Sequence, residues 1–432
     1  DSNHNRIIIS SLSGAIQEVI GEGNIGLKDG DFQTARFFRP QGLCYDPANE
    51  VLYVADTENH AVRKIDLKTR KVSTVAGNGK QAAYPPSGGV GKDVSLSSPW
   101  DVLLLDDTLY VAMAGTHQLW SIDLKTQRAK PYAGTAGENL RDGPREQALL
   151  AQPSGLTTDG SRIYFTDSEV SALRFVDTRE NTVGTVIGEG LFEFGDVDGT
   201  YPQARLQHPL GVAYKDGYVY VADTYNHKIK RIDPKTRRAE TFIGTGKRGM
   251  DDGPAKQATF NEPNGLTFAR GKMYITDTNN HLIRVFDPAS DKLSTLRLTG
   301  IQKLVSRKIS KFTGRETRLS QQQIAPGVKA LHIEIRLPKG TRLNKNAPFH
   351  IVATSDRPES VGVGPLNISA PSSKLTIPIS PRAGTANITV KMSINYCAEG
   401  NEGLCYFKEA KLVVPMKVTP SGASSVFINY AL

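Results

Sequence analysis

A segment of about 55 residues repeats along the first two thirds of the chain. Its clearest copy runs from Val219 to Asp233: β-branched and aromatic residues alternate up to Ala222, a polar turn follows, and alternation resumes through Ile229 and Ile232. The corresponding positions are Asp1, Asp56, Met113, Asp167, Asp223 and Asp277, with spacings of 55, 57, 54, 56 and 54. A hairpin this short is not stable alone. A regular repeat carrying about four strands therefore predicts a β-propeller, whose blades bury their faces against each other.

The repeats predict six blades, the first of them incomplete. Residues 1–24 hold only the second half of a repeat, so we expect Asp1 to lie inside a blade and the natural chain to extend upstream. Most later repeats begin with Pro-x-Gly-Leu or a close variant, as at Pro40 and Pro153. Proline cannot donate to a ladder and glycine permits close backbone approach, which suits the crowded innermost strand.

The repeat ends near Gly300, and a different composition follows. Residues 300–325 are rich in Lys and Arg and are predicted to be a basic linker. Six or seven short strand patterns then predict a small β-sandwich over residues 326–432. The expected fold is all-β: a propeller over residues 1–299, then the linker and the sandwich.

The net charge of +9 is unevenly distributed. Residues 1–300 carry 35 basic and 37 acidic side chains, a net charge of −2, whereas residues 301–432 carry 18 and 7, a net charge of +11. A near-neutral propeller argues against nucleic acid as its partner, because phosphate neutralisation needs a basic face. The chain also has no run of about 18 apolar residues that would predict a membrane span.

The recurring Asp-x-x-Asn-His motif allows two interpretations. Carboxylate, amide and imidazole together are ligands that metals use. In a propeller, however, the copies are spread around the body and cannot converge on one ion, so a structural role for these polar groups is the stronger hypothesis. The sequence predicts no metal, no cofactor and no catalytic residue in this segment.

If the propeller binds a protein, the Pro-x-Gly positions are the expected surface, because the innermost strands converge there. The alternative is a water-filled channel mouth, and a channel-site lyase or hydrolase is a further alternative that rests on fold analogy alone. The candidate binding residues are Arg39, Gln41, Trp100, Gln152, Ser154, His208, Leu210, Glu262 and Asn264.

The three cysteines fall into two groups. Cys44 lies on a predicted innermost strand and reads as a buried small side chain. Cys397 ends one strand and Cys405 begins the next, so the turn between them can bring them together. A structural disulfide, redox-active thiols and free thiols are all open; a disulfide would indicate an oxidising compartment.

Several motifs resemble a known family. Asp223-Thr224-Tyr225-Asn226-His227 and its copies look like NHL repeats, and the stretches 98–102, 112–118, 194–199 and 206–212 are similar to the NHL repeat-containing protein 2 and suppressor of quenching family. The resemblance covers nearly the whole chain, including the Cys397 and Cys405 hairpin.

This resemblance implies a thioredoxin-like domain in cis, upstream of the propeller, and no Cys-x-x-Cys motif occurs here to take its role. It further implies a non-catalytic protein-interaction scaffold for redox-linked regulation, of the photoprotection type in a photosynthetic organism. Thiol-disulfide exchange through Cys397 and Cys405 is the alternative function. The implied location is extracytoplasmic, in a thylakoid lumen or periplasm, with the cytoplasm as the alternative.

Overall fold

The computed structural model describes residues 1–304, 315–344, 350–364, 366, 372–398 and 405–432. The chain forms two compact units, Asp1–Arg307 and Lys308–Leu432. β-strands are the main regular structure of both units, and the helices of the described residues are short 3-10 turns, which confirms the all-β prediction.

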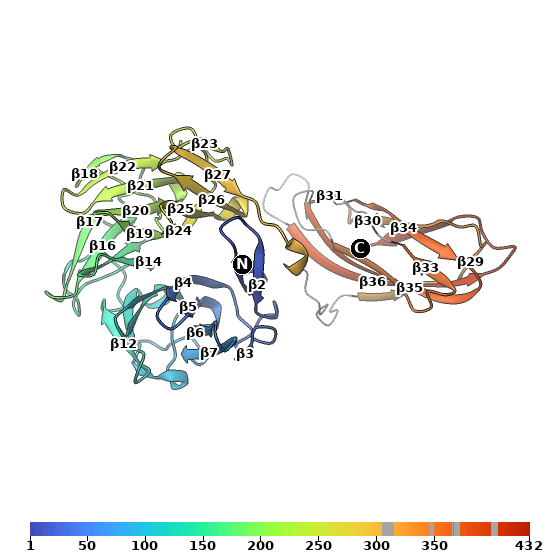
Figure 1. Cartoon of the computed structure of the whole chain (residues 1–432), viewed down its shortest axis with the longest axis horizontal. Helices are drawn as coiled ribbons and strands as arrows, with labels where there is room; N and C mark the ends of the chain where they lie inside the picture. The colour runs from blue at the N-terminus through green and yellow to red at the C-terminus, as the bar shows by residue number, and fades with distance from the viewer. Residues whose placement is uncertain (305–314, 345–349, 365, 367–371, 399–404) are drawn as a thin grey trace. The chain divides into compact units, whose positions relative to one another are not determined.

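Five five-stranded antiparallel sheets follow one another in the first unit (Figure 1). The first two consist of β3 (Gly30–Asp31), β4 (Pro40–Asp46), β5 (Val51–Asp56), β6 (Ala61–Asp66) and β7 (Lys71–Ala76), and of β8 (Gly89–Val90), β9 (Pro99–Leu105), β10 (Thr108–Met113), β11 (Gln118–Asp123) and β12 (Arg128–Ala133). The next three consist of β13 (Gly143–Pro144), β14 (Pro153–Thr158), β15 (Arg162–Asp167), β16 (Ala172–Asp177) and β17 (Thr182–Ile187), of β18 (Gly199–Thr200), β19 (Val212–Lys215), β20 (Tyr218–Asp223), β21 (Lys228–Asp233) and β22 (Arg238–Ile243), and of β23 (Gly253–Pro254), β24 (Pro263–Ala269), β25 (Lys272–Asp277), β26 (Leu282–Asp287) and β27 (Lys292–Leu296).

These sheets are propeller blades. Their innermost strands, β4, β9, β14, β19 and β24, contact one another in that order. Four of the five strands in each blade are those that the repeat predicts. The fifth is a pair of residues, such as Gly143–Pro144, that pairs with the outermost strand and that the repeat pattern does not predict. Two residues carry too little alternation to signal a strand.

The first blade has two strands, β1 (Ile7–Ser10) and β2 (Ile16–Ile20). They lie between the blade of β23–β27 and the blade of β3–β7 (Figure 1). Thr299 bridges Ala15 beside β2, and η7 (Ile301–Leu304) follows it. The architecture is therefore a six-bladed propeller whose first blade is represented by its outer strands, as the sequence predicts.

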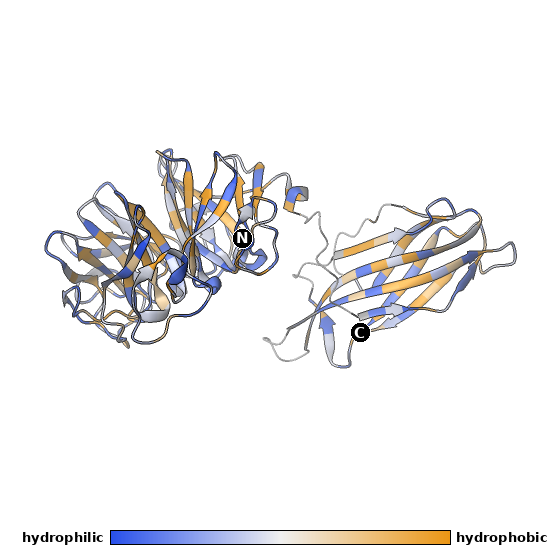
Figure 2. Ribbon diagram, turned by 90° about the horizontal axis from the view of Figure 1, so that it is seen from below, coloured by the Kyte–Doolittle hydropathy of each residue, from blue (hydrophilic) through white to orange (hydrophobic). Residues whose placement is uncertain are grey.

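The Pro-x-Gly glycines mark the closest approach of neighbouring blades. A Cβ on Gly155 would stand 2.3 Å from the carbonyl oxygen of Leu210, and one on Gly211 would stand 2.0 Å from that of Asn264. Any larger residue would force the innermost strands apart. Apolar side chains fill the space between adjacent blades, where the strands are mostly hydrophobic and the connections hydrophilic (Figure 2).

The second unit packs two sheets around one core. One sheet has the order β28–β36–β35–β31, with β29 pairing β36 and β32 pairing β35, and the other has the order β33–β34–β30–β37. Their strands are β28 (Arg315–Arg318), β29 (Gln322–Ile324), β30 (Ala330–Arg336), β31 (Thr341–Leu343), β32 (His350–Ser355), β33 (Val361–Val363), β34 (Lys374–Pro381), β35 (Gly384–Ala398), β36 (Cys405–Val418) and β37 (Val426–Ala431). Ile333, Ile377, Ile388 and Leu412 are among its buried residues, so this unit has the two-sheet form of a β-sandwich.

The linker prediction is wrong at its C-terminal end. Residues 315–318 and 322–324 form β28 and β29, which pair in parallel with β36. The sequence Arg-Glu-Thr-Arg has no apolar alternation from which a strand could be predicted. β28 forms nonetheless, because backbone bonds to β36 hold it in place. Arg307, Lys308 and Lys311 of the predicted linker lie outside the described residues.

Candidate functional site

The motif aspartate organises the loop that leads into its own blade. In the blade of β4, the Asp56 carboxylate accepts the Phe38 N–H at 2.7 Å, the Asn59 amide at 2.8 Å and the Arg63 guanidinium at 2.8 Å. The other guanidinium nitrogen of Arg63 reaches Asp29 at 3.0 Å. Asp167 with Arg174, and Asp277 with Arg284, repeat this arrangement at the same sequence spacing. The motif is structural, as the stronger hypothesis held.

Two further motif positions form hydrogen bonds from one blade to the next in several of the blades. The hydroxyl of Thr57 donates to the Pro99 carbonyl at 2.7 Å, and that of Thr224 donates to the Pro263 carbonyl at 2.9 Å. The Nδ1 of His60 accepts the Ser98 N–H at 3.0 Å. Nδ1 of His117 and of His227 accepts the equivalent N–H of Gln152 and Glu262, each at 3.1 Å. Nδ1 accepts only when the ring is neutral with its proton on Nε2.

The Pro-x-Gly positions lie at the same end of the five innermost strands, and we call this end, with its adjacent turns and loops, the Pro-x-Gly face. Arg39 is exposed there, and seven further predicted residues are half-buried: Gln41, Trp100, Gln152, His208, Leu210, Glu262 and Asn264. Ser154 is a correction. Its side chain is 2% exposed, and its hydroxyl bonds Ser168 Oγ and the Gln152 carbonyl. It cannot contribute to a surface.

Three exposed aromatic side chains outside the predicted set lie on the loop that leads to His208 and in the turn beside it. Phe192 and Phe194, on the loop before the blade of β19, are 85% and 55% exposed. Tyr225, in the turn after β20, is 50% exposed and stacks on His208 with ring centroids 4.5 Å apart. The length of the connection from Glu189 to His208 is a sequence signal for a binding loop, but its two phenylalanines are not among the candidate residues. We call Phe192, Phe194, Tyr225 and His208 the aromatic cluster.

The backbone beneath the aromatic cluster is fixed by hydrogen bonds. Gly195, next to Phe194, donates its N–H to the Leu206 carbonyl at 2.9 Å. Its own carbonyl accepts the side-chain amide of Asn226 at 2.8 Å, and Lys228 pairs with Asp196. The segments that carry Phe194 and Tyr225 are thereby tied to each other, while the rings remain exposed.

Burial alters two titratable groups of the innermost strands, Asp101 and Cys44. Asp101 stands where other blades have glycine, and its carboxylate accepts the Leu156 N–H and the Val102 N–H, both at 2.8 Å. Burial raises its pKa to about 7. Burial, assisted by the Asp101 charge, raises the pKa of the Cys44 thiol to about 12, so that thiol stays protonated and unreactive.

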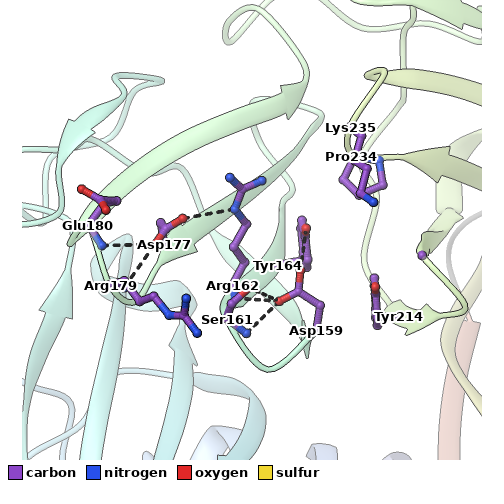
Figure 3. Close-up of a pocket in the computed structure, with 11 residues that line it drawn as sticks. Asp159, Ser161, Arg162, Tyr164, Asp177, Arg179, Glu180, Tyr214, Pro234 and Lys235 are labelled. Carbon is purple, nitrogen blue, oxygen red and sulfur yellow. Dashed lines mark hydrogen bonds and ion pairs between the residues drawn. The ribbon is translucent and has the colours of Figure 1, made fainter.

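The opposite end of the blades holds a polar cavity of about 460 Å³ between two neighbouring blades (Figure 3). Two of its carboxylates, those of Asp159 and Asp177, accept hydrogen bonds within the protein. Asp159 accepts the N–H groups of Ser161 and Arg162 and the Tyr164 hydroxyl, and Asp177 accepts Arg162 Nε at 3.2 Å. Burial raises the pKa of Tyr164 to about 12, so its hydroxyl remains a donor at neutral pH.

Comparison with known proteins identifies the repeat. The NHL repeat family matches residues 37–65, 206–232 and 260–286. This chain is an NHL-repeat protein. It is 36% identical over 96% of its length to Protein SUPPRESSOR OF QUENCHING 1, chloroplastic, from Arabidopsis thaliana, and covers 42% of that protein. It is 35% identical over 97% of its length to NHL repeat-containing protein 2 from Homo sapiens and from Gallus gallus, and covers 65% of each. The chain thus spans less than two thirds of these relatives.

The second unit contains the hairpin that carries Cys397 and Cys405. Cys397 on β35 and Cys405 on β36 are directly opposite in the antiparallel register, and Arg342 on β31 is opposite Cys397 on the other side. Opposite residues in such a ladder have Cα atoms about 4.5 or 5.5 Å apart, within the range of about 4.4 to 6.8 Å that a disulfide needs. The bond itself stays a prediction.

The described residues contain no group of three or more His, Cys, Asp or Glu side chains placed to hold a metal ion. None of the helices in the described part of the chain is long and apolar enough to cross a membrane.

Proposed function

We propose that this chain is a non-catalytic interaction scaffold, and that a protein partner docks on the Pro-x-Gly face of its NHL propeller. The aromatic cluster is the observation that supports this most. Exposed rings on a backbone that is already fixed lose little conformational entropy on binding, and aromatic residues are the common anchors of protein interfaces.

The scaffold acts, in this proposal, within a longer protein. A thioredoxin-like domain in cis and redox-linked regulation, of the photoprotection type in a photosynthetic organism, belong to it. The plant relative, which is named suppressor of quenching 1, chloroplastic, supports that part, as does the length of the relatives beyond the match. The proposed location is a thylakoid lumen or a periplasm.

Removing the rings tests the docking surface. Phe192→Ser with Phe194→Ser should reduce partner capture at least tenfold, because two large apolar contacts are lost. The readout is quantitative mass spectrometry of proteins retained by the immobilised chain. Phe427→Ser is the matched control, since Phe427 is 71% exposed on the second unit. If both variants retain the same partners as the unmodified chain, the aromatic cluster is not the docking surface.

The inner part of the face has its own variant. Trp100→Ala with His208→Ala should weaken capture while lowering the melting temperature little, because both side chains are only half-buried. Unchanged capture would confine the docking surface to the outer loops.

A second candidate function is thiol-disulfide exchange through Cys397 and Cys405. Its support is the register that sets the two cysteines opposite each other beside Arg342. Arg342 is exposed, and a cation beside a cysteine favours its thiolate, which is the reactive form.

A further inference from the structure

A second polar cavity, also of about 460 Å³, lies between the blade of β8–β12 and the blade of β13–β17. Strands β10, β11 and β12 supply one wall, and Arg145, which follows β13, supplies part of the other. Thr108 and Thr126 also line it, and they lie at the ends of β10 and β11 that are remote from the motif turn. The cavity is therefore separate from the Pro-x-Gly face.

A small residue on β11 leaves this space open. Tyr110, Ser121 and Lys130 are opposite one another across β10, β11 and β12, and all three line the cavity. Ser121 is eight positions after the motif residue of its blade. The other complete blades have larger residues at this position, namely Lys64, Phe175, Arg231 and Val285.

Two of these larger residues show how the other blades use the position. Phe175 packs against Tyr164, with ring centroids 6.2 Å apart. Arg231 forms an ion pair with Glu240 on the adjacent strand and lies over the Phe242 ring. In those blades the protein's own side chains occupy the wall, whereas Ser121 cannot reach as far.

The Ser121 hydroxyl lacks a protein partner. Ser121 is 8% exposed, and within the described residues its hydroxyl makes no hydrogen bond. Buried polar groups are nearly always hydrogen-bonded, so this hydroxyl is available to a group that enters the cavity. Burial, followed by the neighbouring Tyr132, raises the pKa of Tyr110 to about 12, and its hydroxyl therefore keeps its proton at neutral pH.

Three basic side chains line the same cavity: Arg128, Lys130 and Arg145. In the part of the chain that the structure describes, none of the three forms an ion pair with a carboxylate. Arg145 is half-buried, and its guanidinium lies 4.5 Å from the centroid of the Tyr132 ring, which positions it beside the cavity. These cations are thus available to an anion from solution.

Two acidic residues, Asp123 and Glu146, also line the cavity. The Asp123 carboxylate accepts the N–H groups of Lys125 and Thr126 at 3.0 and 2.7 Å, so it is held within its own turn. Three cations and two carboxylates give the lining a net charge of +1. The cavity of Figure 3 has three basic and three acidic lining residues, and is therefore neutral.

We propose that the cavity beside Ser121 binds the phosphate group of a small molecule. Lys130 and Arg145 contact its anionic oxygens, and the hydroxyls of Ser121 and Tyr110 donate hydrogen bonds to it. Charged donors bind anions more strongly than neutral ones, and a guanidinium matches the geometry of phosphate. A carboxylate has two oxygens for these four groups, whereas a phosphate ester has three free ones. The volume is within the range of small-molecule sites, about 300 to 1,000 Å³.

Calorimetric titration of residues 1–432 tests the site, with inorganic phosphate and glycerol 3-phosphate as the two probes. We expect one probe molecule to bind per chain. Lys130→Gln with Arg145→Gln should weaken binding at least about tenfold, because two charge-assisted contacts are lost. Tighter binding of inorganic phosphate would identify the free ion as the ligand, and tighter binding of glycerol 3-phosphate would identify an ester.

A second variant closes the cavity. Ser121→Phe introduces the residue that the next blade has at this position, Phe175, and should abolish binding of both probes. Its melting temperature shows whether it folds, and the Lys130 and Arg145 variant tests the proposal independently of it.

Arg179→Gln is the matched control for loss of charge, because Arg179 lines the cavity of Figure 3 instead. At an ionic strength of about 0.1 M, where distant charges are screened, it should change the affinity by less than about twofold. Absence of binding by both probes, unchanged binding in the Lys130 and Arg145 variant, or an equal loss in Arg179→Gln would overturn the proposal.

Discussion

At the scale of single residues, the buried ion pair of each blade explains a regularity in the sequence. Where the motif position is Asp56, Asp167, Asp223 or Asp277, the residue seven positions later is basic and fully buried. Where it is Met113, that residue is Trp120, which is also fully buried. At these motif positions the buried basic residue thus occurs together with its acidic partner, because an unpaired buried charge is strongly unfavourable.

Arg174 provides a direct test of this pairing. Arg174→Met leaves the Asp167 carboxylate buried without its partner 2.7 Å away, and should reduce the free energy of unfolding by about 3 to 5 kcal/mol. Urea denaturation followed by tryptophan fluorescence measures it, since both tryptophans, Trp100 and Trp120, lie in the propeller. Arg179→Met, at an exposed position, is the control. A loss below about 1 kcal/mol would mean that the pair is not needed.

At the scale of elements, the β35–β36 hairpin is the feature that links structure to compartment. Alternation places Tyr396 in the core and Cys397 on the outer face of the sheet. A bond between Cys397 and Cys405 would close a short loop and contribute roughly 2 to 3 kcal/mol in the chain-entropy model.

The cysteine pair is predicted to be bonded in protein from an oxidising compartment. Intact mass after alkylation of denatured, unreduced protein should then show one modified cysteine, Cys44, whose thiol is free. Three modified cysteines would rule the bond out. Reduction beforehand should give three in either case, which controls for incomplete alkylation.

At the scale of the whole molecule, hydrogen bonds from side chains of one blade to the backbone of the next hold the propeller together. Burial lowers the pKa of His60 and of His227 below the ordinary value of 6.5. Because the histidine pKa is lower in the folded state, the neutral histidine contributes its full stabilisation above pH 6.5. This contribution is lost as pH falls below 6.5 toward the pKa of the folded state. Protonation at Nδ1 breaks the bond to the next blade.

The chain contains its own non-titrating alternatives to these histidines. Asn5 Oδ1 and Ser171 Oγ accept the equivalent N–H groups of Arg39 and His208. The variant His60→Asn with His227→Asn should therefore lose less melting temperature than the unmodified chain between about pH 7.5 and about pH 5.5.

The unmodified chain and the double histidine variant contain the same acidic groups, so the titration of these groups affects both proteins equally. Burial raises the pKa of Asp223 to about 7, and the Arg248, Glu262 and Asp277 charges near His227 are common to both. Titration of Asp223 changes stability in the opposite direction, because a carboxyl group whose pKa is raised in the folded state makes the protein less stable as pH rises. Identical changes of melting temperature with pH in the two proteins would show that the histidine hydrogen bonds between blades do not control the stability of the propeller.

Much of the fold follows from local sequence. Each repeat encodes adjacent strands by alternation and joins them with polar turns, so the blades, their order and the incomplete first blade could be predicted without a structure. The Pro-x-Gly glycines were correctly placed for the same reason. The structural role of Asp56 and its equivalents also followed, because a propeller keeps such motifs apart.

Tertiary structure alone decided what the repeats do to one another. The hydrogen bonds of Thr57 and His60 to the next blade join residues 42 and 38 positions apart. These residues come together only when neighbouring blades pack. Burial of Ser154, and exposure of Phe192 and Phe194, likewise depend on where a loop settles. β28 and β29 were missed because their ladders with β36 use backbone groups, which every residue carries and which therefore leave no side-chain pattern to find.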